Sequence, residues 1–406
     1  CGFLQRARHC FTICGGEVMA VPKLRFKEFG GALKQDKLVN FTYWSSGGTP
    51  SKDNEEYWNG DIPLISGASM HTNKLYESDV KITKLGLQKG SKLAPTNSIL
   101  ILVRGSMLFN KIPMGITLCD VAFNQDVKCI QPKEQLSPNF LYQWLSAKEN
   151  VIQNKVTSTG IGAGKLDTSD LQNLQISIPS KQEQTKIASF LSAVDEKISQ
   201  LTQKHELLSQ YKQGMMQKLF SQQIRFKADD GSEFGEWEEK ILKDLFPKIR
   251  NGFVGVATPY YVNYGVKYLQ GKNIKNGKID ATGLIFINQE FHQKKTNSIL
   301  KTNDILMVQS GHVGECAVVT EDYDNANCHA LLVLSPKSSK LINSKFVVYY
   351  FYSEIGKKKI ALIKTGNTIE HILASDIKEV ALLFPCLAEQ TKIANFLSAI
   401  DQKIEV

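Results

Sequence analysis

The chain has 406 residues, of which 42% are hydrophobic and 22% are charged, a composition typical of globular proteins that excludes a fibrous or largely disordered chain. This length suits two or three domains, each with its own core. The net charge of +9 is compatible with a nucleic-acid partner, but it is weak support for one because it is unevenly distributed: residues 39–178 hold 13 Lys and Arg against 12 Asp and Glu, whereas residues 241–383 hold 18 against 12.

The first twenty residues, "CGFLQRARHCFTICGGEVMA", do not resemble a secretory signal because Gly15, Gly16 and Glu17 interrupt the apolar stretch. We predict that residues 1–20 are a non-native or upstream leader and that Met19 is the natural start. Cysteines 1, 10 and 14 with histidine 9 are the one cluster of potential metal ligands, but their spacing matches no zinc site. We therefore predict neither a metal nor a cofactor.

The remaining cysteines are scattered among apolar neighbours, which favours reduced thiols and a cytoplasmic location. Apolar runs such as "SILILV" (98–103) have the length of a strand and fall far short of the roughly 20 residues of a membrane span. No membrane segment is predicted.

Residues 21–179 are predicted to form a mixed α+β domain. Short apolar strands alternate with turns, as in "IPLIS" (62–66) and "VKCIQP" (127–132), and "PNFLYQWLSAKE" (138–149) has the apolar spacing of a helix at Phe140, Trp144 and Leu145.

Residues 180–222 are predicted to form a long helix. Apolar residues recur in steps of three and four from Ile187 through Leu191, Val194 and Ile198 to Leu201, which indicates a seam for a partner helix. An amphipathic helix lying on its own domain is the alternative. On the same seam, His205 and Lys212 could fix the register of the helices, but we expect them to mark where the seam opens to solvent.

The second half of the chain repeats the first. "EQTKIASFLSAVDEKI" (183–198) recurs as "EQTKIANFLSAIDQKI" (389–404) with three differences, an offset of 206 residues (Glu183 to Glu389) that also relates "TNSIL" at Thr96 to "TNDIL" at Thr302. Residues 223–384 are therefore predicted to be a second domain like the first, and residues 385–406 a second, shorter helix. So long a period is typical of duplicated domains and not of a solenoid.

No segment of the sequence matches a complete catalytic motif. "TGIGAGKL" (159–166) resembles a phosphate-binding loop, yet Thr159 replaces the leading glycine and Leu166 replaces the Ser or Thr that follows the lysine. No histidine pair has the spacing of a metal site. We therefore predict a binding protein without catalytic activity of its own.

Several segments in this order resemble the DNA specificity subunit of type I restriction-modification systems. They are "GGTPSKDNEEYWNGDIPLIS" (47–66), "FNQDVKCIQP" (123–132), "IPSKQEQTKIASFLSAVDEKI" (178–198), "YKQGMMQKLFSQQIRF" (211–226) and "GEWEEKILKDLF" (235–246). The resemblance covers residues 21–406. It implies two target recognition domains alternating with long conserved helices that pair as an antiparallel coiled coil.

The resemblance also implies the partners. Each recognition domain would read one half of a bipartite, asymmetric site in double-stranded DNA. The helices would set the distance between the halves and dock two modification (methyltransferase) subunits, and restriction subunits (ATP-dependent translocase and nuclease) would join the full complex. A free-standing scaffold that assembles proteins through its helices, or the recognition fragment of a fused restriction-modification enzyme, remains the alternative.

Candidate DNA-binding residues are polar side chains in predicted loops, where base edges and phosphates can be reached. They are Ser46, Lys52, Lys74, Arg104 and Lys165 in the first domain and Lys272, Lys275, Gln309, His312, Lys364 and Asn367 in the second. The candidate partner-binding residues occur in both copies of the repeated helix and lie off its seam: Gln184, Lys186, Phe190, Gln390, Lys392 and Phe396.

Overall fold

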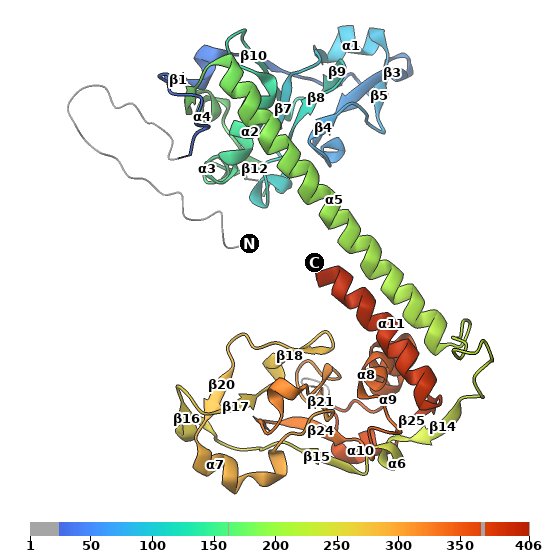
Figure 1. Cartoon of the computed structure of the whole chain (residues 1–406). Helices are drawn as coiled ribbons and strands as arrows, with labels where there is room; N and C mark the ends of the chain where they lie inside the picture. Colours follow the sequence, from blue (N-terminus) through green and yellow to red (C-terminus); the bar gives the residue numbers. More distant parts are fainter. Residues whose placement is uncertain (1–23, 161, 367–369, 406) are drawn as a thin grey trace. The chain divides into compact units, whose positions relative to one another are not determined.

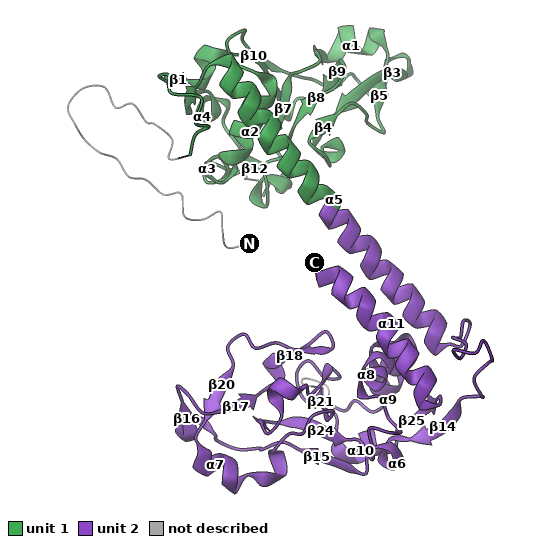
Figure 2. Ribbon diagram, in the orientation of Figure 1, with its two compact units in different colours: residues 1–200 green, residues 201–406 purple. Residues whose placement is uncertain are grey.

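The computed structural model describes residues 24–160, 162–366 and 370–405 (Figure 1). The predicted leader, with its three cysteines, lies outside these ranges. The chain divides into two compact units, residues 1–200 and 201–406, which are coloured separately in Figure 2. We call the globular part of the first unit module 1 (residues 24–180) and that of the second module 2 (residues 224–386).

Module 1 is built on two antiparallel-rich sheets and a terminal strand pair. The main sheet has the order β2-β10-β7-β8-β4 and the smaller sheet the order β5-β3-β9-β6, while β1 pairs with β13 and β11 with β12. The strands are β1 (Lys34–Lys37), β2 (Thr42–Ser46), β3 (Trp58–Ile65), β4 (Lys74–Leu75), β5 (Lys81–Ile82), β6 (Lys92–Ala94), β7 (Ile99–Leu102), β8 (Met114–Thr117), β9 (Val121–Phe123), β10 (Val127–Pro132), β11 (Thr157–Ser158), β12 (Gly164–Lys165) and β13 (Gln175–Ile178).

The helices of module 1 are short, and only α5 extends beyond it. They are α1 (Lys84–Gly90), α2 (Pro138–Ala147), α3 (Glu149–Gln153), α4 (Thr168–Gln172) and α5 (Lys181–Phe220). The predicted helix over 138–149 corresponds to α2, which begins with Pro138 at its first turn, a position where the missing N–H has no cost.

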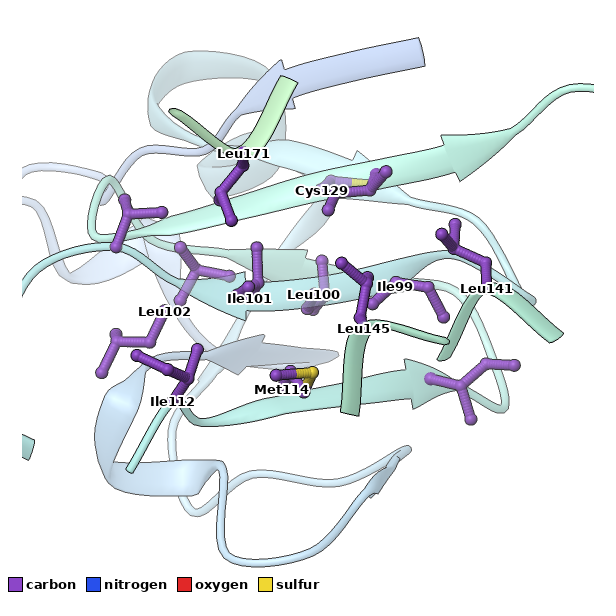
Figure 3. Close-up of a cluster of buried hydrophobic side chains, with 14 of the residues drawn as sticks. Ile99, Leu100, Ile101, Leu102, Ile112, Met114, Cys129, Leu141, Leu145 and Leu171 are labelled. Carbon is purple, nitrogen blue, oxygen red and sulfur yellow. The ribbon is translucent and has the colours of Figure 1, made fainter. Parts of the chain in front are cut away.

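The core of module 1 lies where α2 packs against the main sheet (Figure 3). All four residues of β7 are at most 2% exposed, so this central strand is buried on both faces. Leu141 and Leu145 of α2 cover the sheet one helical turn apart, and each is fully buried. Burying a leucine side chain contributes about 2 kcal/mol, so this packing is a main source of the module's stability.

Module 2 repeats this plan. Its main sheet has the order β15-β24-β21-β22, its second sheet the order β16-β20-β17-β23, and β14 pairs with β25 as β1 pairs with β13. The strands are β14 (Glu238–Ile241), β15 (Lys248–Asn251), β16 (Tyr261–Val262), β17 (Val266–Leu269), β18 (Ile274–Lys275), β19 (Lys278–Ile279), β20 (Ile285–Ile287), β21 (Ile305–Val308), β22 (Cys316–Val318), β23 (Asn327–Cys328), β24 (Leu331–Ser335) and β25 (Ala381–Phe384).

The helices of the second unit include the repeated one at its end. They are α6 (Leu242–Leu245), α7 (Gln289–Lys294), α8 (Ser344–Tyr352), α9 (Glu354–Leu362), α10 (Ala374–Lys378) and α11 (Leu387–Glu405). The mixed α+β fold and the duplication are therefore confirmed. Within the described residues, no helix is long and apolar enough to cross a membrane.

The repeated Glu-Gln dipeptide fastens each long helix to its own module through the glutamate. Glu183 accepts two hydrogen bonds of 2.6 Å from the Nε and Nη2 atoms of Arg25. Glu389 accepts the same two bonds from Arg225, at 3.0 and 2.8 Å, and a third of 3.0 Å from Trp237 Nε1. These planar, bidentate pairs recur in both units, so the duplication extends to individual side chains.

The seam of α11 is buried in module 2, where Ile393, Leu397 and Ile400 join the core beside α8. This helix thus lies on its own module, and it also contacts α5, as predicted for the two repeated helices. The end of α5 reaches the same core, and Lys212 Nζ of α5 contacts Asp401 Oδ1 of α11 at 2.5 Å. The prediction that Lys212 is solvated was wrong, because this ion pair leaves its side chain only 22% exposed.

Candidate nucleic-acid interface

Three segments of module 1 meet at one edge of its main sheet. Strands β2 and β7 are both antiparallel to β10, which lies between them, so β2 and β7 run in the same direction. The end of β2 at Ser46, the residues after β7 up to Arg104, and the start of β10 at Lys128 are therefore neighbours. Ser46 and Lys128 are direct partners in the strand register.

Cations gather at this edge. Lys128 Nζ donates a hydrogen bond to Ser46 Oγ. Partial burial lowers the pKa of Lys128, and the positive charges of Arg104 and Lys92 lower it further. Lys165 is beside them because it forms a backbone bridge with Arg104. We call these five residues, Ser46, Lys92, Arg104, Lys128 and Lys165, the cationic edge.

The cationic edge carries uncompensated positive charge. Lys165 is paired with Asp167 at 2.7 Å, but Lys92, Arg104 and Lys128 have no ion pair among the residues that the structure describes. Crowding cations without carboxylates costs free energy in the isolated protein, and an anionic ligand would recover it. This arrangement suits the phosphates of a nucleic acid or the acceptor atoms of guanine.

Of the residues predicted in module 1 from the sequence, Ser46, Arg104 and Lys165 come together at this edge. Lys52 is exposed in the loop after β2. Lys74 pairs with Ile116 on β8, and the register places this position beside the start of β7, at the opposite edge of the sheet from Arg104. Two residues of the cationic edge, Lys92 and Lys128, were missed.

The corresponding edge of module 2 is electrically neutral. Asn251 at the end of β15 pairs with Leu332 of β24, as Ser46 pairs with Lys128. Ser310, after β21, forms a backbone bridge with His371, as Arg104 does with Lys165. Asn251, Ser310 and His371, which we call the neutral edge, are exposed at the positions of Ser46, Arg104 and Lys165, whereas Leu332, at the position of Lys128, is fully buried.

Two of the residues predicted in module 2 lie close to the neutral edge. Gln309 directly follows β21, and its backbone oxygen accepts a hydrogen bond of 2.9 Å from the N–H of Ile372. His312 is exposed in the same loop. Lys364 is also nearby in the chain, but its ammonium is 2.8 Å from the Glu370 carboxylate, which compensates its charge.

Among the described residues, no hydrogen bond or ion pair joins the side chains of Lys272 and Lys275 to this edge. Lys272 precedes the β18–β19 hairpin, and Lys275 on that hairpin is paired with Asp280 at 3.0 Å. Asn367 lies outside the described residues. No group of three or more His, Cys, Asp or Glu side chains that could hold a metal ion occurs in the described part of the chain.

Comparison with known proteins identifies the family. Residues 36–210 and 235–406 each match the model of the type I restriction modification DNA specificity domain. The chain belongs to the family of type I restriction-modification specificity subunits. Such a subunit is the non-catalytic component of a type I enzyme and the one that confers DNA specificity, as the sequence predicted.

Relatives and a solved structure support this assignment. The chain is 26% identical over 395 residues to the MjaVIII specificity subunit of Methanocaldococcus jannaschii, covering 94% of this chain and 90% of the relative. It is 32% identical over 182 residues to the EcoR124I/EcoR124II specificity subunit of Escherichia coli, covering 44% and 45%. The S subunit from M. genitalium has a similar fold, with a TM-score of 0.60, 16% identity and coverage of 95% and 93%.

Two of the six candidate partner-binding residues of this specificity subunit are buried. Gln184 and Gln390 are each 1% exposed. Gln184 Oε1 accepts a 2.7 Å hydrogen bond from the Ser137 N–H, and its Nε2 donates to the Pro179 oxygen at 2.9 Å; Gln390 makes the equivalent bonds, of 2.9 Å each. Their side chains fix the helix to the module and are not available to a partner, which corrects the expectation from the sequence.

The lysines and phenylalanines of the set contact the first residues of each module. Lys186 is paired with Glu28, and Lys392 is 2.6 Å from Asp229. Phe190 meets the edge of Phe26 with ring centroids 6.0 Å apart, and Phe396 meets Phe226 in the same way at 5.5 Å. Phe190 remains 57% exposed. An aromatic side chain this exposed on a helix is a common feature of binding surfaces.

Proposed function

We propose that this specificity subunit recognises a bipartite, asymmetric site in double-stranded DNA, with module 1 reading one half and module 2 the other. The single observation that carries the proposal is the contrast between the cationic edge and the neutral edge. Two modules with one fold hold different exposed side chains at equivalent positions, such as Arg104 and Ser310. Equivalent surfaces with different chemistry are what reading two different half-sites requires.

The repeated helices are proposed to assemble the complex. Two modification subunits would dock on the equivalent surfaces around Phe190 of α5 and Phe396 of α11, and restriction subunits would join them in the full enzyme. The segment of α5 between the modules would set the distance between the two half-sites. The complex would act in the cytoplasm, and this subunit would need no cofactor.

Exchange of one module tests independent reading. Replacing residues 39–178 with the matching segment of another specificity subunit should change one half of the methylated motif and leave the other half and the spacing unchanged, because each edge belongs to one module. Sequencing-based mapping of methylated adenines in cells that express the subunit with its modification partner gives the result. A change in both halves would refute independent reading. Methylation that shows no sequence motif would favour the alternative that the subunit is a scaffold for protein assembly.

Assembly is expected to depend on Phe190. Replacing Phe190 by Asp should weaken binding of the modification subunit by about tenfold or more, since an exposed aromatic residue at an interface centre commonly contributes more than about 1 kcal/mol. Because Phe190 is already 57% exposed, the melting temperature should change little. The measurement is the affinity of the purified subunits for each other, by calorimetry.

Tyr43 offers the matched control for this substitution. It is 62% exposed, lies on β2 of the same unit, and is not on the repeated helix. Tyr43→Asp should therefore leave assembly unchanged. Equal affinities for the Phe190→Asp and Tyr43→Asp variants would count against the proposed docking surface.

A further inference from the structure

The neutral edge of module 2 continues into a loop that exposes two valines. The loop, residues 252–257, leaves the end of β15, where the chain of module 1 leaves β2 with Gly47 and Gly48. Val254 is 66% exposed and Val256 is 74% exposed. Aliphatic side chains so exposed are singly unremarkable, but two in one short loop beside a proposed ligand-binding edge require an explanation.

This loop is held at both ends, so the valines are presented in a defined way. The Phe253 N–H donates to the Cys328 oxygen at 2.9 Å, and the Phe253 oxygen accepts from the Ala330 N–H at 2.9 Å. The Phe253 ring packs edge-on against Phe291, with centroids 5.0 Å apart. At the other end, Ala257 is only 3% exposed.

A glycine between the two valines sets the path of the loop. Gly255 has a φ of +141°, a conformation that favours glycine. A Cβ atom at this position would also lie 3.0 Å from the Phe253 ring. Phe253 thus turns inward while Val254 and Val256 remain at the surface, and any larger residue at position 255 would disturb that division.

The chemistry of base edges narrows what these valines can contact. In the major groove the C5-methyl group of thymine is the apolar group that a base pair presents, and it is read by apolar side chains. The Lys295 ammonium beside the loop lies 5.0 Å over the Phe253 ring, on the inward-turned residue, whereas the exposed amide of Asn251 on the neutral edge can pair with adenine. The two exposed valines and the Asn251 amide favour A·T pairs.

We propose that Val254 and Val256 determine specificity in module 2 by contacting thymine methyl groups in the major groove of its half-site. This inference rests on the proposed function, since it assumes that module 2 reads DNA through this edge. It adds the class of base pair read there and the residues that read it. At the corresponding positions of module 1, Gly47 and Gly48 carry no side chain that could make this contact.

Replacing thymine by deoxyuridine tests the contact, because this change removes the methyl group alone. The probe is a duplex containing the mapped methylation motif, bound by the specificity subunit assembled with its modification subunits and measured by fluorescence anisotropy. At one or two positions of the module 2 half-site, deoxyuridine should raise Kd about fourfold, equivalent to about 0.8 kcal/mol for one buried methyl group. The Val254→Ala, Val256→Ala double variant should bind thymine and deoxyuridine duplexes equally.

The matched control is deoxyuridine in the other half-site, where the valine variant and the unaltered protein should respond alike. Indifference of the unaltered protein to deoxyuridine at every position of the module 2 half-site would overturn the inference. The inference would also be overturned if the valine double variant kept the full sensitivity of Kd to deoxyuridine. The same holds if that variant bound DNA normally and instead lost affinity for the modification subunits. Failure of the proposed function itself is distinguishable, because the unaltered protein would then bind a scrambled duplex as well as the motif.

Discussion

Removing two charges from the cationic edge, by Arg104→Ala with Lys128→Ala, is expected to weaken binding of the assembled complex to its DNA by about ten- to a hundredfold at moderate salt. Neither cation has a carboxylate partner among the described residues, so both are free to neutralise phosphates. For each phosphate that the protein no longer neutralises, the slope of log K against log salt should fall by about 0.9, so the double variant should reduce it by nearly 2.

The measurement is a salt titration of Kd with the mapped duplex. Lys243→Ala is the matched control, because its ammonium lies 2.8 Å from the Glu379 carboxylate and contributes little net charge to a ligand. An unchanged salt slope for the Arg104 and Lys128 double variant would place the DNA elsewhere. A slope that falls with no loss of motif preference would assign these residues to phosphates and not to bases.

Proton uptake should accompany binding at this edge. The pKa of Lys128 is lowered by partial burial and by the nearby charges of Arg104 and Lys92, so the lysine loses its proton at a lower pH than an ordinary lysine does. DNA phosphates stabilise the protonated form and raise that pKa again. The affinity should therefore fall as the pH rises through the lowered pKa, and earlier than the titration of ordinary lysines would predict.

The fold was largely predictable because duplication is visible in the sequence itself. The repeated segment at Glu183 and Glu389 indicated two equivalent domains, and the apolar spacing around Phe140 indicated the helix that covers the first sheet. Local patterns of this kind depend only on residues near one another in the chain, so they can be recognised before the fold is known.

The site could be predicted only in part, because it depends on strand order. Ser46, Arg104 and Lys128 are far apart in the sequence and become neighbours only because β10 inserts between β2 and β7. Lys128 lies between Val127 and Cys129 in a predicted apolar strand, and the sequence did not show that its side chain lies beside Ser46 and Arg104. Polar residues in loops could be recognised from the sequence, whereas the register that pairs residues of neighbouring strands could not.

Burial of polar residues was the second limit. Gln184 and Gln390 are polar residues at the start of a helix, where we expected exposure to solvent. Their side-chain amides instead donate hydrogen bonds to backbone oxygens of a preceding loop and of the residue that follows a strand. Their buried environment follows from the way that each helix begins against its module. A pattern of polarity along one helix does not show which turn of it is covered by another element.

The largest loss of stability is expected on replacing Glu389 by Gln. The Glu389 side chain is fully buried and accepts two hydrogen bonds from Arg225 and one from Trp237. Glutamine keeps the size but removes the negative charge, which leaves the guanidinium of Arg225 without its buried counterion; the Glu236 carboxylate, 3.9 Å away, is 93% exposed. Removing one partner of a buried ion pair costs about 3 kcal/mol of stability, because the other charge stays buried and unpaired. Replacing both partners by apolar residues costs far less.

For a unit of this size, a loss of about 3 kcal/mol should lower the melting temperature of the second unit by roughly 6 to 12 °C. Calorimetry of the full chain measures it, with hydrogen exchange to assign the affected transition to residues 201–406. The control is Glu379→Gln, whose ion pair with Lys243 is exposed, with side chains 61% and 47% accessible, and is worth less than about 1 kcal/mol. If both substitutions lowered the melting temperature equally, the buried pair at the start of α11 would not be what fastens this helix to module 2.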